Sequence, residues 1–156
     1  YEASTIDAIT ESGVAESVLV KADGARMREF KAPDEREPQI PTSADTVIPI
    51  ASAHVVGKPL TEKYVHRPEH VAAIADIEVG ETIRTVDVAA VVASERGGLK
   101  DIPSKATAIP LVNKIDDEQD EQVGRDIAAE ILARADVPRV VLARMNSKNP
   151  LVAVVE

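Results

Sequence analysis

Residues 108–116 read AIPLVNKID, a short apolar run that ends in a polar tetrad. An apolar run followed by a polar turn and then a long periodic segment is typical of a buried strand that leads into a helix. The periodic segment is residues 118–135, whose apolar side chains recur at three- and four-residue spacing. We therefore predict a strand over 107–112, a polar turn over 113–116 and a helix over 118–135.

Strands and helices alternate along the rest of the chain. The patterns predict strands over 17–22, 46–51, 139–143 and 151–155, and helices over 5–13, 68–75 and 84–95. Runs that are apolar throughout indicate strands buried on both faces, as in a parallel sheet covered by helices. A length of 156 residues is typical of one domain. We predict a single α/β domain over residues 1–156, with a mostly parallel sheet flanked by helices.

The tetrad at residues 113–116 has the form N-K-x-D. In guanine-nucleotide proteins this pattern ends a buried strand, where the carboxylate accepts hydrogen bonds from the guanine edge and the Lys stem packs along the base. We therefore expect Asn113, Lys114 and Asp116 to recognise the base of a nucleotide, GTP in preference to ATP. The alternative is an incidental polar turn in which Asp116 caps the helix that begins near Glu118.

A second candidate site follows the predicted strand 17–22, whose end presents Asp23. Hard cations such as Mg²⁺ take carboxylate oxygens and keep several waters, so we expect Asp23 to hold magnesium beside a nucleotide. Arg26 and Lys31 follow closely and are candidates to face phosphates. The alternative is an ordinary Asp-Gly turn in a solvated loop over 23–43, where prolines at 33, 38 and 41 exclude a continuous helix.

Two histidine patterns carry less weight. His66 to His70 reads HRPEH and matches the H-x-x-E-H pattern of some zinc hydrolases. We reject that interpretation because Pro68 places His66 before the helix starts, so the two imidazoles cannot share a helical face. His54 has no identifiable partner in the sequence, and we expect it to be a structural polar residue.

The composition excludes several classes of partner. The net charge is -9, from 27 acidic and 18 basic residues, which opposes binding to a phosphate backbone. Aromatic residues make up 2% of the chain, too few for stacking on bases, and there is no cysteine for a thiolate metal site. No apolar stretch approaches the about 20 residues of a membrane span. We expect a cytoplasmic protein with no nucleic-acid or membrane partner.

The acidic balance also suggests a halophilic origin, because acidic surfaces are common in high-salt cytoplasm. An ordinary acidic protein is the alternative. A melting temperature that does not rise in molar salt would contradict the halophilic interpretation.

Several motifs together resemble the YqeC-type selenium cofactor biosynthesis family. They are the runs VLVKADGAR at 18–26, FKAP at 30–33, GKPL at 57–60, VHRPE at 65–69 and VNKID at 112–116, with Glu37, Pro38 and Pro41 between them. The order and spacing match over nearly the whole chain. Members are described as accessory proteins of selenium-dependent molybdenum hydroxylases and resemble phosphate-loop (P-loop) NTPases. The resemblance implies that Asp23 is the magnesium-site aspartate and that residues 113–116 read the base.

The same resemblance implies that this chain corresponds to the C-terminal part of such an NTPase domain. No G-x-x-x-x-G-K-[ST] loop occurs in it, and it begins at Tyr1 without an initiator Met. We therefore expect the domain to be incomplete at its amino end and this chain to be inactive as an NTPase. The expected role is a nucleotide-binding accessory protein in maturation of a selenium-dependent molybdenum hydroxylase. The alternative is a non-catalytic interaction module that holds a partner enzyme through its Pro-rich loop.

Overall fold

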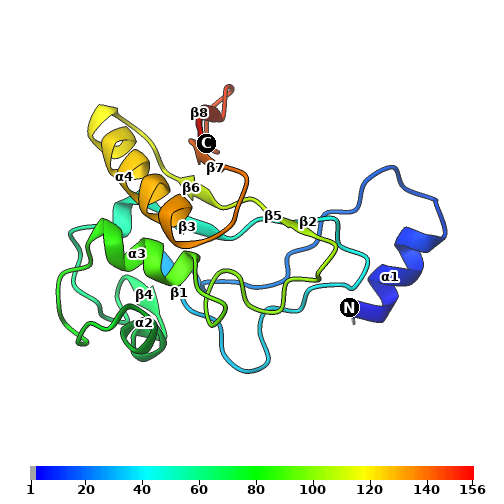
Figure 1. The fold of residues 1–156 in the computed structure, drawn as a ribbon, viewed down its shortest axis with the longest axis horizontal. Helices are drawn as coiled ribbons and strands as arrows, with labels where there is room; N and C mark the ends of the chain where they lie inside the picture. The colour runs from blue at the N-terminus through cyan, green and yellow to red at the C-terminus, as the bar shows by residue number, and fades with distance from the viewer. Residues whose placement is uncertain (1–2) are drawn as a thin grey trace.

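The computed structural model describes residues 3–156 as an α/β protein built on a four-stranded sheet (Figure 1). The elements are α1 (Ala3–Glu11), β1 (Phe30–Lys31), β2 (Thr46–Val47), β3 (Ile50–Ser52), the 3-10 helix η1 (Ala53–Val55), β4 (Val65–His66), α2 (Pro68–Ala75), α3 (Thr85–Val92), β5 (Thr107–Ala108), β6 (Leu111–Asn113), α4 (Glu118–Arg134), β7 (Val140–Ala143) and β8 (Leu151–Val155). The fold class predicted from the sequence is confirmed.

The main sheet has the strand order β3-β6-β7-β8. β3, β6 and β7 are parallel, whereas β8 pairs antiparallel with β7. The long helix α4 connects β6 to β7, as a parallel crossover requires, but only residues 144–150 separate β7 from β8. A connection this short cannot make a crossover, so β8 returns as a hairpin partner.

Two of the predicted strands are interrupted by proline. The run 46–51 splits at Pro49 into β2 and β3, and the run 107–112 splits at Pro110 into β5 and β6. A proline nitrogen cannot donate to the ladder, so pairing breaks at these positions. The outer pieces β2 and β5 pair in parallel and extend away from the main sheet, towards the end of the molecule where α1 lies (Figure 1).

The two faces of the main sheet differ in burial, and the expectation of strands buried on both faces is wrong. The register aligns Ala51, Val112 and Leu142 in one row, and all three are buried on the side where α3 and α4 pack. The neighbouring row runs from Ile50 to Val154, which are 65% and 44% exposed. The apolar composition of these strands therefore did not imply that both of their faces are buried.

The predicted strand over 17–22 does not form in the described residues, which is a second correction. Its Leu19 is 97% exposed, and Gln39 N donates to Ala22 O at 3.0 Å without a paired strand forming. An apolar run becomes a strand only when a neighbouring strand satisfies its backbone groups. Asp23 consequently follows an irregular segment and does not end a strand.

The helices match their sequence signals closely. α2 begins at Pro68, whose missing N–H is harmless in the first turn, and α4 is capped by Asp117, whose side chain accepts from Asp120 N at 2.9 Å. α3 ends at Val92, earlier than predicted, because the chain folds back through Gly97 and Gly98. A Cβ on Gly97 would lie 2.0 Å from Val91 O, so the close approach requires glycine.

No helix among residues 3–156 is long and apolar enough to cross a lipid bilayer.

Candidate functional site

The carboxyl ends of three parallel strands meet at one edge of the main sheet. Ser52 at the end of β3 pairs in register with Asn113 at the end of β6, and β7 ends beside them at Ala143. Ligands of open parallel sheets bind at this edge, where loops replace strands. We call it the carboxyl edge, and it is the region where the N-K-x-D tetrad lies.

The tetrad is held by the loop that follows β7. The Asn113 side-chain oxygen accepts from Met145 N at 3.1 Å, and Ile115 N donates to Ala143 O at 3.1 Å. Arg144 Nη1 donates to the carbonyl of Asp116 at 3.2 Å. These bonds join two loops that are distant in the sequence, so the tetrad has a fixed backbone at the carboxyl edge.

Lys114 has a left-handed backbone, with φ 63°, and its ammonium is already paired. Its Nζ lies 2.7 Å from both carboxylate oxygens of Glu29, which also accepts from Ser52 Oγ at 2.7 Å. Burial works against ionisation of Glu29, but the hydrogen bonds from Lys114 and Ser52 outweigh it and lower its pKa. The charge of Lys114 is thus balanced by Glu29, while its methylene stem is not engaged by that contact.

Asp116 is not the cap of α4, because Asp117 takes that role. The interpretation in which Asp116 caps the helix is therefore wrong. Its side chain is 42% exposed, and Oδ2 lies 3.4 Å from Nε2 of His54. The same imidazole nitrogen lies 3.2 Å from Oδ2 of Asp120.

His54 is the site residue that the sequence analysis missed, and the expectation that it lacks a partner is wrong. It lies in η1, directly after β3, and one of its carboxylate partners is 66 residues further along the chain. Only the pairing of β3 with β6 brings these residues together. The usable signal was its position: a histidine just past the end of a parallel strand lies at the ligand-binding edge of the sheet.

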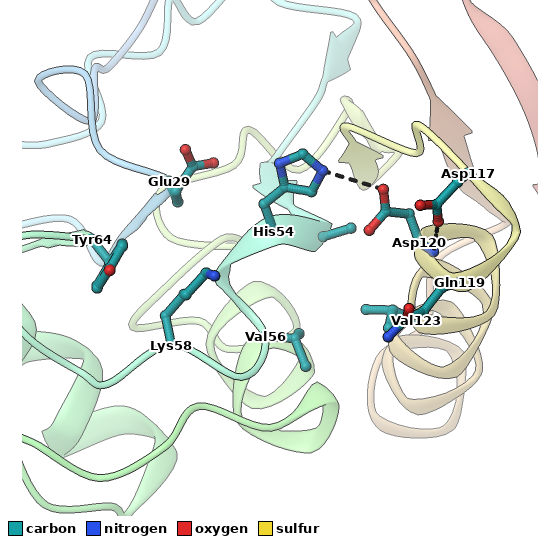
Figure 2. A pocket seen from close by; sticks show the side chains of 10 residues that line it. Glu29, His54, Val56, Lys58, Tyr64, Asp117, Gln119, Asp120 and Val123 are labelled. Atoms are coloured by element: carbon teal, nitrogen blue, oxygen red, sulfur yellow. Dashed lines mark hydrogen bonds and ion pairs between the residues drawn. The ribbon is translucent and has the colours of Figure 1, made fainter.

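A cavity of ≈ 460 Å³ opens beside this cluster (Figure 2). His54 and Asp120 approach each other on one side of it, and Lys58, Tyr64 and Glu29 come from the other side. Val56 and Val123 add apolar lining. The cavity therefore offers ionisable groups of both signs and an apolar wall, as small-molecule sites do.

Asp23 and Lys31, which were predicted to hold magnesium and phosphate, lie in a different cluster of charges. We call it the loop cluster, and it consists of Asp23, Lys31, Asp34, Glu37 and Arg67. Lys31 Nζ lies 2.5 Å from Asp23 Oδ1 and 2.6 Å from Glu37 Oε2. Arg67 lies 2.5 Å from Glu37 and 2.7 Å from Asp34. Each basic group thus contacts two carboxylates.

These contacts oppose burial in setting the ionisation of Glu37. Burial alone would raise its pKa, but the hydrogen bonds from Arg67 and Lys31 outweigh that effect and lower the pKa to about 2. Magnesium at Asp23 would have to bind beside the ammonium of Lys31, which lies 2.5 Å from Oδ1. That role stays a prediction, and no hydrogen bond or ion pair among residues 3–156 joins Asp23 to the N-K-x-D tetrad.

Arg26 belongs to the same region, in a turn with φ 49°. Burial, followed by the charges of Arg67, Lys31 and Arg26, lowers the pKa of His66. His66 lies in β4 and its Nδ1 is buried with no hydrogen-bond partner among the described residues, whereas His70 Nδ1 lies 3.1 Å from Pro33 O. The two imidazoles thus lie in different surroundings, one in β4 and one against Pro33, which agrees with the rejection of the H-x-x-E-H site.

Comparison with known proteins shows similarity to one family. The family model described as YqeC protein matches residues 1–69, a segment that contains both the loop cluster and His54. The chain is 31% identical over 114 residues to the uncharacterized protein YqeC of Escherichia coli (strain K12). That match covers 73% of this chain and 44% of the relative, so the chain spans less than half the length of the relative it matches. No solved structure shows a significant match.

Proposed function

We propose that this YqeC-type chain carries the base-recognising part of a guanine-nucleotide site. The observation that supports this most is the N-K-x-D tetrad, which follows a parallel strand at the carboxyl edge and is braced by the loop after β7. A fixed backbone at that edge is what positions a side chain to read a planar base.

Each residue of the tetrad has a role in the proposal. Asp116 presents a half-exposed carboxylate, which can accept two hydrogen bonds from the N1 and N2 groups of guanine. Lys114 offers its methylene stem to the base, while Glu29 balances its ammonium. Asn113 keeps the two loops together through Met145 and can turn its amide N–H groups to the ring.

The wider role we propose is that of an accessory protein in maturation of a selenium-dependent molybdenum hydroxylase, with GTP and Mg²⁺ as ligands. The motifs shared with the YqeC family support this proposal. In that role Asp23 would bind magnesium and Arg26 and Lys31 would lie near phosphates, after Lys31 leaves its pairs in the loop cluster. Because the chain contains no G-x-x-x-x-G-K-[ST] loop, we expect binding without hydrolysis.

Calorimetric titration of the chain with GDP, GTP and ATP in the presence of Mg²⁺ tests the proposal. We expect guanine nucleotides to bind in preference to ATP. Asp116→Asn should weaken GDP by about tenfold or more and favour xanthosine diphosphate, because an amide can donate to the carbonyl that replaces the guanine amino group. Asp136→Asn, at an exposed site, is the matched control.

Equal binding of GDP and ATP, or an unchanged preference in Asp116→Asn, would contradict base recognition. If no nucleotide binds, the interaction module becomes the better interpretation.

A further inference from the structure

Three side chains converge at the carboxyl edge, and base recognition as proposed uses only one of them, Asp116. One ligand atom from each of His54, Asp116 and Asp120 lies within 4.8 Å of the other two. The residues come from η1, from the tetrad and from the first turn of α4. We propose that His54, Asp116 and Asp120 bind a divalent transition metal of the zinc class.

The separations between these atoms match such an ion. His54 Nε2 lies 3.2 Å from Asp120 Oδ2 and 3.4 Å from Asp116 Oδ2. Ligands bound at about 2.0–2.1 Å around a tetrahedral metal are about 3.3–3.4 Å apart. An ion placed among the three atoms therefore meets His54 and either carboxylate at bonding distance with little movement of the side chains.

The charge of the cluster favours a cation. Among residues 3–156, no Lys or Arg side chain forms an ion pair with the carboxylate of Asp116 or Asp120. Lys114 is engaged by Glu29, and Arg144 contacts the carbonyl of Asp116 instead of its carboxylate. Two carboxylates with a neutral imidazole carry two negative charges, which a divalent ion neutralises.

The ligands are also held in place by their own backbones. Asp120 Oδ2 accepts from Asp116 N at 3.1 Å, and Asp120 N donates to the cap residue Asp117 at 2.9 Å. His54 N donates to Ser52 Oγ at 3.2 Å, at the end of β3. Because all three positions are fixed by the sheet edge and the helix cap, binding the ion orders few additional groups.

The ligand set selects the metal. Imidazole nitrogen suits Zn²⁺, Co²⁺ and Ni²⁺, whereas Mg²⁺ prefers six oxygens in octahedral geometry. Three protein ligands leave a fourth position for water or another molecule. His54 and Asp120 line the ≈ 460 Å³ cavity, so a small ligand in the cavity can reach that position (Figure 2).

This site goes beyond the proposed nucleotide function and shares only Asp116 with it. His54→Gln is therefore the decisive variant, because it removes a metal ligand and leaves Asn113, Lys114 and Asp116 unchanged. Asp120→Asn is the second variant, and its amide oxygen can still accept from Asp116 N, so the local fold is retained.

The experiment titrates the chain, freed of any affinity tag, with Co²⁺ followed by its visible absorption and with Zn²⁺ by calorimetry, both without nucleotide. We expect one ion per chain and an affinity for Zn²⁺ well above that for Mg²⁺. His54→Gln and Asp120→Asn should each weaken Zn²⁺ by about tenfold or more, since loss of even an outer partner costs that much. His70→Gln, which alters the contact with Pro33, should leave the affinity unchanged.

Circular dichroism confirms that each variant is folded. Failure to bind Zn²⁺, equal binding of Mg²⁺, or an unchanged affinity in His54→Gln would overturn the metal site. None of these results bears on nucleotide binding, which is measured separately through Asp116→Asn and GDP.

Discussion

The loop cluster and the carboxyl edge are both rich in charge, but they balance it differently. In the loop cluster, Lys31 and Arg67 each contact two carboxylates, and the shared acid Glu37 has a pKa of about 2. At the carboxyl edge, Asp116 and Asp120 face a single imidazole. In the loop cluster every carboxylate contacts a Lys or Arg side chain, whereas among residues 3–156 no Lys or Arg side chain forms an ion pair with either carboxylate at the carboxyl edge.

This difference changes what a ligand must do to bind in each region. Removing one member of a paired network leaves its partner charge uncompensated, which is destabilising, and a ligand that enters the network competes with the existing partners. Two neighbouring carboxylates without a Lys or Arg partner repel each other, and an added cation relieves that repulsion. A charged residue in a sequence motif is therefore weaker evidence for a ligand-binding site than a charged group without a Lys, Arg, Asp or Glu partner of opposite sign in the structure.

The largest expected effect tests the structural role of the loop cluster. Because the pKa of Glu37 falls from 4.5 to about 2 on folding, its contribution is complete above pH 4.5 and is lost as the pH falls towards 2. After allowance for solvent screening, we expect Glu37→Gln to lower the free energy of unfolding by about 2 kcal/mol at neutral pH. Urea denaturation over this pH range measures both effects.

Glu35→Gln is the matched control, since Glu35 is exposed and two residues away. The stability of Glu37→Gln should fall less than that of the parent chain as the pH is lowered from 4.5 to about 2, because the variant has no carboxylate to protonate at this position. If both variants are equally stable at neutral pH, the ion pairs of Glu37 do not stabilise the fold, and the proposed difference between the loop cluster and the carboxyl edge is wrong.

Local patterns in the sequence were sufficient for the elements that depend on local signals. Pro68 fixed the start of α2, the apolar spacing defined α4, and the position of the tetrad after an apolar run placed it at the carboxyl edge. Residues 17–22 show where that reasoning ends. They have the composition of a strand, but strand formation needs a partner whose position no local pattern contains.

The site shows the same division. The motifs predicted ligand contacts for Asp23, Lys31 and Lys114. In the structure, Asp23 pairs with Lys31 and Lys114 pairs with Glu29, and no motif contains these pairings. His54 joins Asp116 and Asp120 only after β3 and β6 pair, because its partners are far away in the chain. Contacts of this kind follow from topology, so the composition of a motif can name candidates without showing what they touch.

The second prediction concerns the packing that supports the carboxyl edge. Gly124 lies in α4 against Ile115 and Leu142, and a Cβ there would be 2.8 Å from Ile115 Cδ1. Gly124→Val should therefore cost about 1.5 kcal/mol through overpacking and weaken Zn²⁺ binding by shifting Asp120. Thermal melts and the calorimetric titration measure these two effects.

Ala129→Val, at an exposed position of the same helix, controls for the β-branched side chain. The acid destabilisation due to Glu37 should be the same in Gly124→Val as in the parent chain. A change in that acid response would show that the two regions are coupled and that they cannot be treated separately.

The smallest expected effect gives the most direct comparison of the two regions. Replacing an acid by its amide should lower stability in the loop cluster and raise it at the carboxyl edge. Asp116→Asn removes one of two carboxylates that face His54, so in the absence of metal it should raise stability by about 0.5 kcal/mol at low salt. The gain should fade at high salt, where repulsion between the exposed carboxylates is screened. Urea denaturation with a chelator present measures it, with Asp136→Asn at an exposed site as the control.

A loss of stability in Asp116→Asn comparable to that in Glu37→Gln would mean that the carboxyl edge is a structural network like the loop cluster.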